Sequence, residues 1–206
     1  MQEKDVYAEL SSIRDLMERS SKFISLSGLS GVLAGIYALA GAGLGYKLVS
    51  NFQSPSGPTD NYVFEPVIFW QLFIIAIAVL VFSLVTGCWL TMRKAREKGQ
   101  NVWNPVSHRL LSAMAVPLFT GGLFILIMIS KGDYPYIASA CLIFYGLALV
   151  AGSHYTYTDI KWLGICEILL GLAALILPAY GLILWTTGFG LLHILYGSIM
   201  HFKYDR

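Results

Sequence analysis

Long apolar runs alternate with short polar segments along most of the chain. Each run has roughly 18–27 residues, and a helix rising about 1.5 Å per residue needs about 20 to cross roughly 30 Å of hydrocarbon. The pattern therefore predicts an all-α polytopic membrane bundle of six transmembrane helices. The expected spans are residues 23–49, 66–92, 110–130, 135–152, 160–177 and 180–200.

The first 22 residues follow a different pattern. Val6, Leu10, Ile13 and Met17 recur at helical spacing, and the opposite face mixes acidic with basic side chains. We expect a cytoplasmic amphipathic helix over residues 1–22, ahead of a transmembrane domain over residues 23–206. Because these residues are largely polar, we expect no signal peptide.

The polar face of this helix bears on what it contacts. Its mixed charge argues against an anionic lipid surface, which favours a basic face. A cytoplasmic protein partner or the protein's own loops fit better, and a solvated helix without a specific partner is the alternative.

The positions of the basic residues predict the orientation. All of the 14 Lys and Arg residues except Lys47 and Lys131 fall on one side of the predicted spans. Cytoplasmic loops carry the excess of basic residues. We therefore expect a multi-pass protein of the cell inner (plasma) membrane, with both termini in the cytoplasm.

Composition agrees with a membrane protein and argues against other classes. Charged residues make up 13% of the chain, about half the share typical of soluble domains. A net charge of +2 is too small to predict nucleic-acid binding. The three cysteines stand singly in apolar runs and indicate no disulfide framework. No nucleotide-binding, hydrolase or kinase motif occurs, so no cofactor is predicted.

Small residues at helical spacing predict close helix packing in the first span. Ser27, Gly31 and Gly35 are each four residues apart, a spacing that lets two helix backbones approach each other in a membrane. Packing within the monomer is the favoured interpretation. A homo-oligomer formed through Gly31 and Gly35 is the alternative.

The first span also resembles the fifth. Residues 28–39 align with residues 164–175, with glycines and aliphatic residues at matching positions. The alignment predicts parallel hairpins made of spans one and two and of spans five and six, with the middle spans as a diverged third hairpin.

The last hairpin resembles a known family. Trp162, the segment 168–178, Gly188 and Gly197 look like the hairpin repeat of the HdeD-like acid-resistance membrane proteins, over about 40 residues. This resemblance implies a small six-span protein built of hairpins. The whole chain is similar to an uncharacterised family of small bacterial inner-membrane proteins, which implies no particular activity.

Ionisable residues inside a span are costly and are functional candidates by default. Glu167 in the fifth span and His193 in the sixth are the two that lie clearly inside. Each is seven residues from the cytoplasmic end of its span, which places both roughly 10 Å deep. Because a tight turn joins the two spans, a Glu167–His193 hydrogen bond is expected if both side chains face the interior.

The same counting puts Ser30, Thr86, Pro117 and Tyr145 in or near this layer. We interpret the layer as a candidate substrate- or proton-binding site, and a structural hydrogen bond that fixes helix packing is the alternative. The histidines do not have the spacing of a metal motif, so no metal site is predicted.

The leading functional hypothesis is a non-enzymatic membrane protein that senses or binds something in the bilayer and relays this to a cytoplasmic partner. It rests on the amphipathic helix, the basic loop 93–109 and the lack of a catalytic motif. The first alternative is a transporter or channel with a proton-sensitive Glu/His site. The second is a metal-dependent membrane enzyme.

Overall fold

Helices make up the regular structure of the described residues, which are 27–51, 66–97, 99 and 102–205 of this computed structural model. The predicted amphipathic helix over residues 1–22 lies outside them. The α-helices are α2 (Gly28–Asn51), α3 (Pro66–Glu97), α4 (Pro105–Lys131), α5 (Ile137–Gly152), α6 (Asp159–Ile176), α7 (Gly181–Thr186) and α8 (His193–Met200). A π-helical segment, η5 (Thr187–Leu192), joins α7 to α8, and a second, η6 (His201–Asp205), continues α8.

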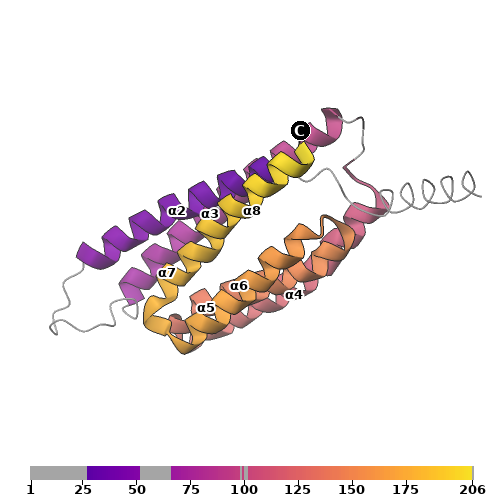
Figure 1. Cartoon of the computed structure of the whole chain (residues 1–206). Helices are drawn as coiled ribbons and strands as arrows, with labels where there is room; N and C mark the ends of the chain where they lie inside the picture. Colours follow the sequence, from indigo (N-terminus) through magenta and orange to yellow (C-terminus); the bar gives the residue numbers. More distant parts are fainter. Residues whose placement is uncertain (1–26, 52–65, 98, 100–101, 206) are drawn as a thin grey trace, which may run out of the picture.

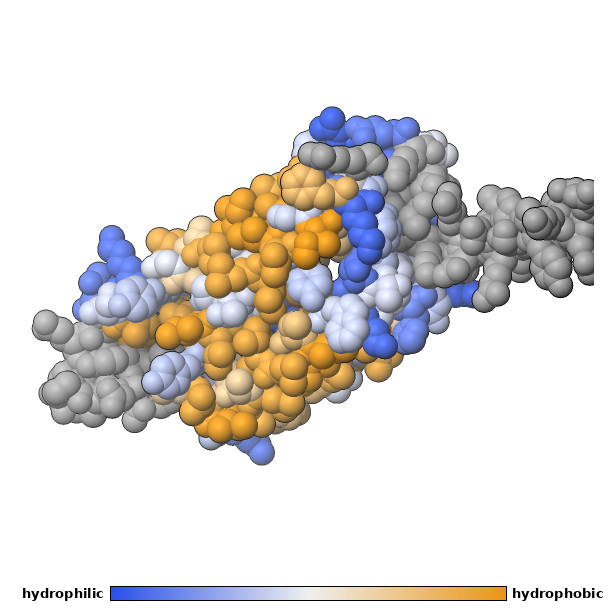
Figure 2. Space-filling model, in the orientation of Figure 1, coloured by the Kyte–Doolittle hydropathy of each residue, from blue (hydrophilic) through white to orange (hydrophobic). Residues whose placement is uncertain are grey.

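Five helical stretches are long and apolar enough to cross a membrane, which confirms an all-α protein with multiple candidate spans. They are Gly28–Asn51, Val67–Glu97, Pro105–Lys131, Tyr134–Tyr155 and Pro178–Tyr204. Apolar side chains cover the middle of the face in Figure 2, and hydrophilic residues gather towards its ends. The remaining long helix, α6, has 18 residues but carries Asp159, Lys161 and Glu167.

Two helices begin or end beyond their predicted spans, because polar residues extend them. α3 continues to Glu97. In its last turns, Arg93 Nε forms an ion pair of 2.9 Å with Oε1 of Glu97, one helical turn further along. α4 begins at Pro105 with a capping box, in which Asn104 and Ser107 satisfy each other's backbone N–H groups. Hydropathy alone does not detect such polar ends.

The helices form two layers of three (Figure 1). α2 packs between α3 and α8 in one layer, and α5 packs between α4 and α6 in the other. α6 packs far more extensively on α5 than on α7 or α8, which follow it in the chain. Of the three predicted hairpins, those of α2 with α3 and of α4 with α5 pack together, whereas the two arms of the last hairpin belong to different layers.

Glycines line the closest seam of each layer. A Cβ atom on Gly197 would lie 2.6 Å from the backbone N of Val32, and one on Gly35 would lie 2.6 Å from the carbonyl O of Gly190. In the other layer, Gly146 and Gly164 approach each other in the same way. Both aligned glycine patterns thus make close helix contacts, but the partner of α2 is α8 whereas the partner of α6 is α5.

The glycines of the first span are used within one chain. A Cβ on Gly31 would lie 3.2 Å from the Cα of Gly197, so α8 occupies the face that Gly31 and Gly35 share. This agrees with the favoured interpretation, packing inside the monomer. A homo-oligomer through the same two glycines would have to displace α8.

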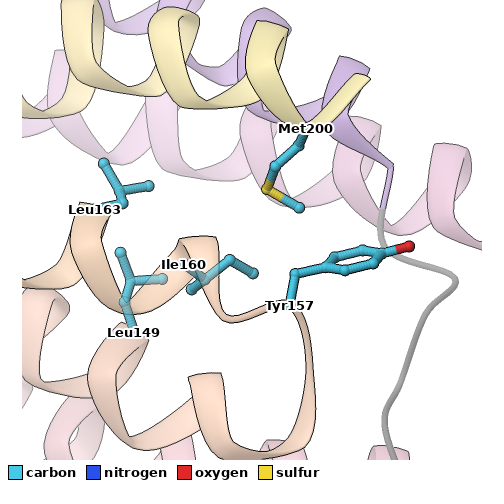
Figure 3. Close-up of a cluster of buried hydrophobic side chains, with 5 residues drawn as sticks. All are labelled: Leu149, Tyr157, Ile160, Leu163 and Met200. Atoms are coloured by element: carbon cyan, nitrogen blue, oxygen red, sulfur yellow. The ribbon is translucent and has the colours of Figure 1, made fainter. Parts of the chain in front are cut away.

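Apolar side chains connect the layers near the C-terminal end of the bundle. A buried cluster joins α8 to α5, α6 and the segment between them, as Figure 3 shows. Its members are Leu149, Tyr157, Ile160, Leu163 and Met200.

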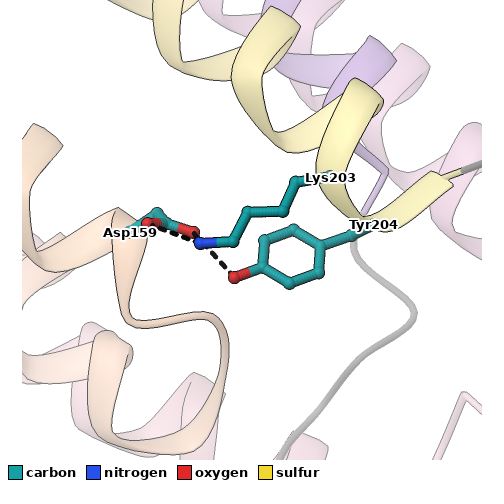
Figure 4. Close-up of polar contacts among 3 residues, drawn as sticks. All are labelled: Asp159, Lys203 and Tyr204. Carbon is teal, nitrogen blue, oxygen red and sulfur yellow. Dashed lines mark hydrogen bonds and ion pairs between the residues drawn. The ribbon is translucent and has the colours of Figure 1, made fainter.

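Polar contacts lie beside this cluster (Figure 4). Lys203 Nζ is 2.9 Å from Asp159 Oδ2, and the Tyr204 hydroxyl donates to the same oxygen at 2.7 Å. Partial burial raises the pKa of Asp159, but the hydrogen bonds from Lys203 and Tyr204 outweigh it and hold that pKa below its usual range. The start of α6 is therefore tied to the end of the α8 span.

Candidate proton- and ligand-binding site

Glu167 faces the interior because it lies on the packed face of α6. Gly164, Glu167, Gly171 and Ala174 recur at three- and four-residue spacing and are all buried. The glycines draw α5 close on this face, and the Glu167 side chain is fully buried as a result. Burial of a carboxyl group at such a seam is costly without a compensating partner.

His193 lies opposite Glu167, at the point where η5 passes into α8. Its Nε2 atom is 2.8 Å from the Tyr145 hydroxyl, and its Nδ1 atom is 3.0 Å from the carbonyl O of Gly188. The same Nδ1 atom is 3.4 Å from Glu167 Oε1. The structure thus brings together Glu167, His193 and Tyr145 from three different helices.

The expected Glu167–His193 hydrogen bond is not formed, which corrects the prediction from span counting. The two groups are in contact, but the Nδ1 atom makes its hydrogen bond with Gly188 instead. Neither carboxyl oxygen of Glu167 has a hydrogen-bond partner among the described residues. Counting residues along each span could predict that Glu167 and His193 are in contact. It could not predict which acceptor the Nδ1–H group of His193 points to.

Aromatic rings hold the imidazole in place. The His193 ring stacks on Tyr145 at 5.5 Å and on Phe189 at 5.8 Å between ring centroids. Tyr145 and Phe189 are themselves 5.0 Å apart. Three mutually packed rings restrict rotation of the imidazole and preserve its hydrogen bonds.

The other three predicted site residues make their contacts elsewhere. Ser30, in the first turn of α2, donates to the carbonyl of Ser27 just before that helix, at 2.6 Å. Thr86 pairs with the Tyr37 hydroxyl at 3.3 Å. Pro117 lies inside α4 and does not border the site. Each of the six predicted site residues lies on a different helix, but only Tyr145, Glu167 and His193 meet at the centre.

Sequence reasoning missed Gly188, which supplies both a carbonyl acceptor and space. A Cβ on Gly188 would collide with Glu167 Oε2. A glycine here allows the carboxyl group to lie against η5. In a chain with 20 glycines, nothing in its spacing distinguishes this role from ordinary helix packing.

A cavity of about 1000 Å³ separates the two layers beside this group. Its walls are mainly apolar and come from α2, α3, α4, α5, the start of α6 and the α7–α8 span. Tyr145 and His193 border the cavity, whereas Glu167 lies behind them. Within the described residues, α3 and α4 make no extensive contact with each other, although both line the cavity.

The part of the chain that the structure describes contains no group of three or more His, Cys, Asp or Glu side chains arranged to hold a metal ion. The metal-dependent enzyme therefore gains no support from these residues. Comparisons with protein-family models, curated proteins and solved structures found no match. The resemblance to the HdeD-like proteins accordingly stays a prediction.

Proposed function

We propose that this protein is a non-enzymatic, six-span membrane protein that binds an acyl-chain lipid of the bilayer between its two helix layers. The observation that carries the proposal is the apolar cavity of about 1000 Å³. Its volume is at the upper end of ordinary ligand pockets, about 300–1000 Å³, and its few polar groups are of the kind that orient a ligand.

α6 serves as the sixth span in this proposal. Asp159 and Lys161 lie in its first turn, where the interface accommodates charge, so Glu167 is its one charged residue at membrane depth. Its 18 residues cover about 27 Å at about 1.5 Å per residue. With six spans, the distribution of basic residues supports cytoplasmic termini for a protein of the bacterial inner membrane.

Lipid reaches the cavity laterally in this proposal. α3 and α4 both expose large apolar side chains such as Ile74 and Phe119, and the two helices are not packed together. An acyl chain that passes between α3 and α4 would leave the apolar bilayer for an apolar cavity, so its entry would expose no apolar surface to water. Its polar head would then meet Tyr145 and His193, the hydrogen-bonding groups of the cavity wall nearest to Glu167.

Filling the cavity should prevent binding. Gly87 on α3 and Gly122 on α4 line it, and a Cβ on either would meet nothing within 4 Å. Gly87→Phe and Gly122→Phe are expected to exclude about three methylenes, a loss of about 2.4 kcal/mol or roughly fiftyfold in affinity. The measurement is crosslinking of a diazirine-labelled fatty acid to the full chain in phosphatidylethanolamine–phosphatidylglycerol vesicles.

Gly43→Phe is the matched control, because Gly43 is an exposed glycine with equally open surroundings that does not line the cavity. It should crosslink like the wild type. Equal crosslinking in all four proteins, or label found only on outward-facing residues, would argue against a lipid site between the layers.

The proposal includes a relay to a cytoplasmic protein through the helix expected over residues 1–22. The support is the mixed charge of its polar face and the apolar stripe of Val6, Leu10, Ile13 and Met17. Proteins that co-purify with the full chain should be lost when residues 1–22 are deleted. Identical partners for both forms would exclude this role for the helix.

Transport is the second candidate, favoured by the arrangement around η5. A π-helical interruption is frequent at functional sites, and here it adjoins a buried carboxyl–imidazole pair. The central helices of the two layers, α2 and α5, also run in opposite directions (Figure 1), as in inverted-repeat transporters. Proton flux into liposomes that Glu167→Gln abolishes would support this candidate, and equal flux in both proteins would oppose it.

A further inference from the structure

The carboxyl group of Glu167 has no charge compensation except from His193 among the described residues. Its side chain is fully buried, and its closest polar contact is the 3.4 Å approach to His193 Nδ1. A buried carboxylate without a cation or hydrogen bonds costs several kcal/mol. The pair must therefore carry a proton that offsets this charge.

The hydrogen-bond partners of His193 determine the position of one imidazole proton. The Gly188 carbonyl can only accept, so Nδ1 carries a hydrogen and donates to it. Nε2 faces the Tyr145 hydroxyl, which both donates and accepts. A neutral ring accepts from Tyr145, and a doubly protonated ring donates to Tyr145 after the hydroxyl rotates. His193 can therefore gain or lose a proton at Nε2 and keep both hydrogen bonds.

Two arrangements then carry the same number of protons. Glu167 is a carboxylic acid beside a neutral His193, or it is a carboxylate beside a doubly protonated His193. Both are neutral overall, as a site in the membrane requires. Removing the shared proton would leave a bare buried carboxylate.

We propose that Glu167 and His193 form a membrane-embedded site that binds one exchangeable proton, with Tyr145 connecting the site to the cavity. The exchangeable proton enters the site at His193 Nε2, because His193 and Tyr145 border the cavity and Glu167 does not. Gly188 is a positioning residue, since any side chain there would displace the carboxyl group. The proposal does not depend on lipid occupying the cavity.

Other titratable groups lie around the pair without replacing it. α5 contributes Cys141 besides Tyr145, and α8 contributes Tyr196, which interacts with Cys166 of α6. η5 contains no titratable side chain. Among the described residues, the only ion-pair contact of Glu167 is with His193. The net charge of the site therefore depends on how many protons these two side chains hold together.

The test measures both protonation states in the full chain, reconstituted without added fatty acid at neutral pH. Infrared difference spectra between wild type and Glu167→Gln report whether the carboxyl is protonated, and ¹⁵N NMR of His193 reports the imidazole. We expect one proton shared by the pair, seen either as a carboxylic acid with a neutral imidazole or as a carboxylate with an imidazolium. The proton should exchange in D₂O.

A carboxylate beside a neutral imidazole would overturn the proposal, as would a carboxylic acid beside an imidazolium or a proton that does not exchange. Asp133→Asn is the matched control, because Asp133 lies exposed in the segment after α4. It should leave both signals unchanged. If Glu167→Gln does not insert into the membrane, infrared difference spectra of the wild type between H₂O and D₂O report the carboxyl group in its place, because the C=O band of a carboxylic acid shifts on deuteration. Because this measurement reports only the protons on Glu167 and His193, failure here is distinct from failure of the lipid-binding proposal.

Discussion

Replacing Gly197 by leucine should destabilise the protein by about 3 kcal/mol or more. This is at or above the largest cost that is usual when a side chain is too big for a packed core. A side chain at this position meets backbone atoms of α2: its Cβ would lie 2.6 Å from Val32 N and 2.8 Å from Gly28 O. Backbone cannot rotate away as a flexible side chain does, so α2 and α8 would have to separate. Denaturation of the purified protein in mixed micelles, monitored by circular dichroism, measures the loss.

Gly43→Leu serves as the control in the same assay. Gly43 is exposed on α2, and a Cβ there meets nothing within 4 Å. Leucine should be neutral or slightly stabilising, because glycine is the poorer helix former by about 1 kcal/mol. If Gly197→Leu were as stable as Gly43→Leu, the close seam between α2 and α8 would be wrong.

Replacing Glu167 by methionine should leave the protein equally stable or stabilise it by about 1–4 kcal/mol, the range seen when buried ionic groups give way to apolar ones. The reason is that the Glu167 oxygens have no hydrogen-bond partner among the described residues. His193→Phe should instead destabilise by about 3–5 kcal/mol, because it removes the ion-pair contact that the described residues give to a buried carboxyl group.

The double variant Glu167→Met/His193→Phe completes the cycle. It should recover most of the stability that His193→Phe loses, since no carboxyl group remains to be compensated. The same micelle denaturation measures all four proteins. A large loss of stability in Glu167→Met would mean instead that the carboxyl group stabilises the helix packing, so that Glu167 has a structural role.

The comparison of Glu167 with Ser30 shows how far the site could be predicted. Depth in a membrane follows from counting residues at about 1.5 Å each, and counting placed both residues near one layer. Depth does not say which way a side chain points around its helix. Glu167 shares the packed face of α6 with Gly164 and Gly171, whereas Ser30 donates to the carbonyl of Ser27, just before its own helix.

Gly188 illustrates the opposite case, a residue whose role could not be predicted. Its carbonyl is available to His193 Nδ1 at 3.0 Å, and its missing side chain leaves room for Glu167. Both properties depend on how η5 lies against α6. A π-helical segment has no clear pattern in a uniformly apolar sequence, so neither could be derived from residue spacing.

By itself, the sequence determined that the chain forms long apolar helices and that an acid and a histidine lie at one depth within them. The physical reason is that burial of apolar residues and hydrogen bonding within a helix are local properties. Only the tertiary structure decided the rest: the two layers, which divide the last hairpin, the cavity between them, and the contact of Glu167 with His193 and Gly188. These depend on which helix faces pack together, and in a uniformly apolar bundle that choice is made by backbone approach and side-chain shape, which hydropathy does not describe.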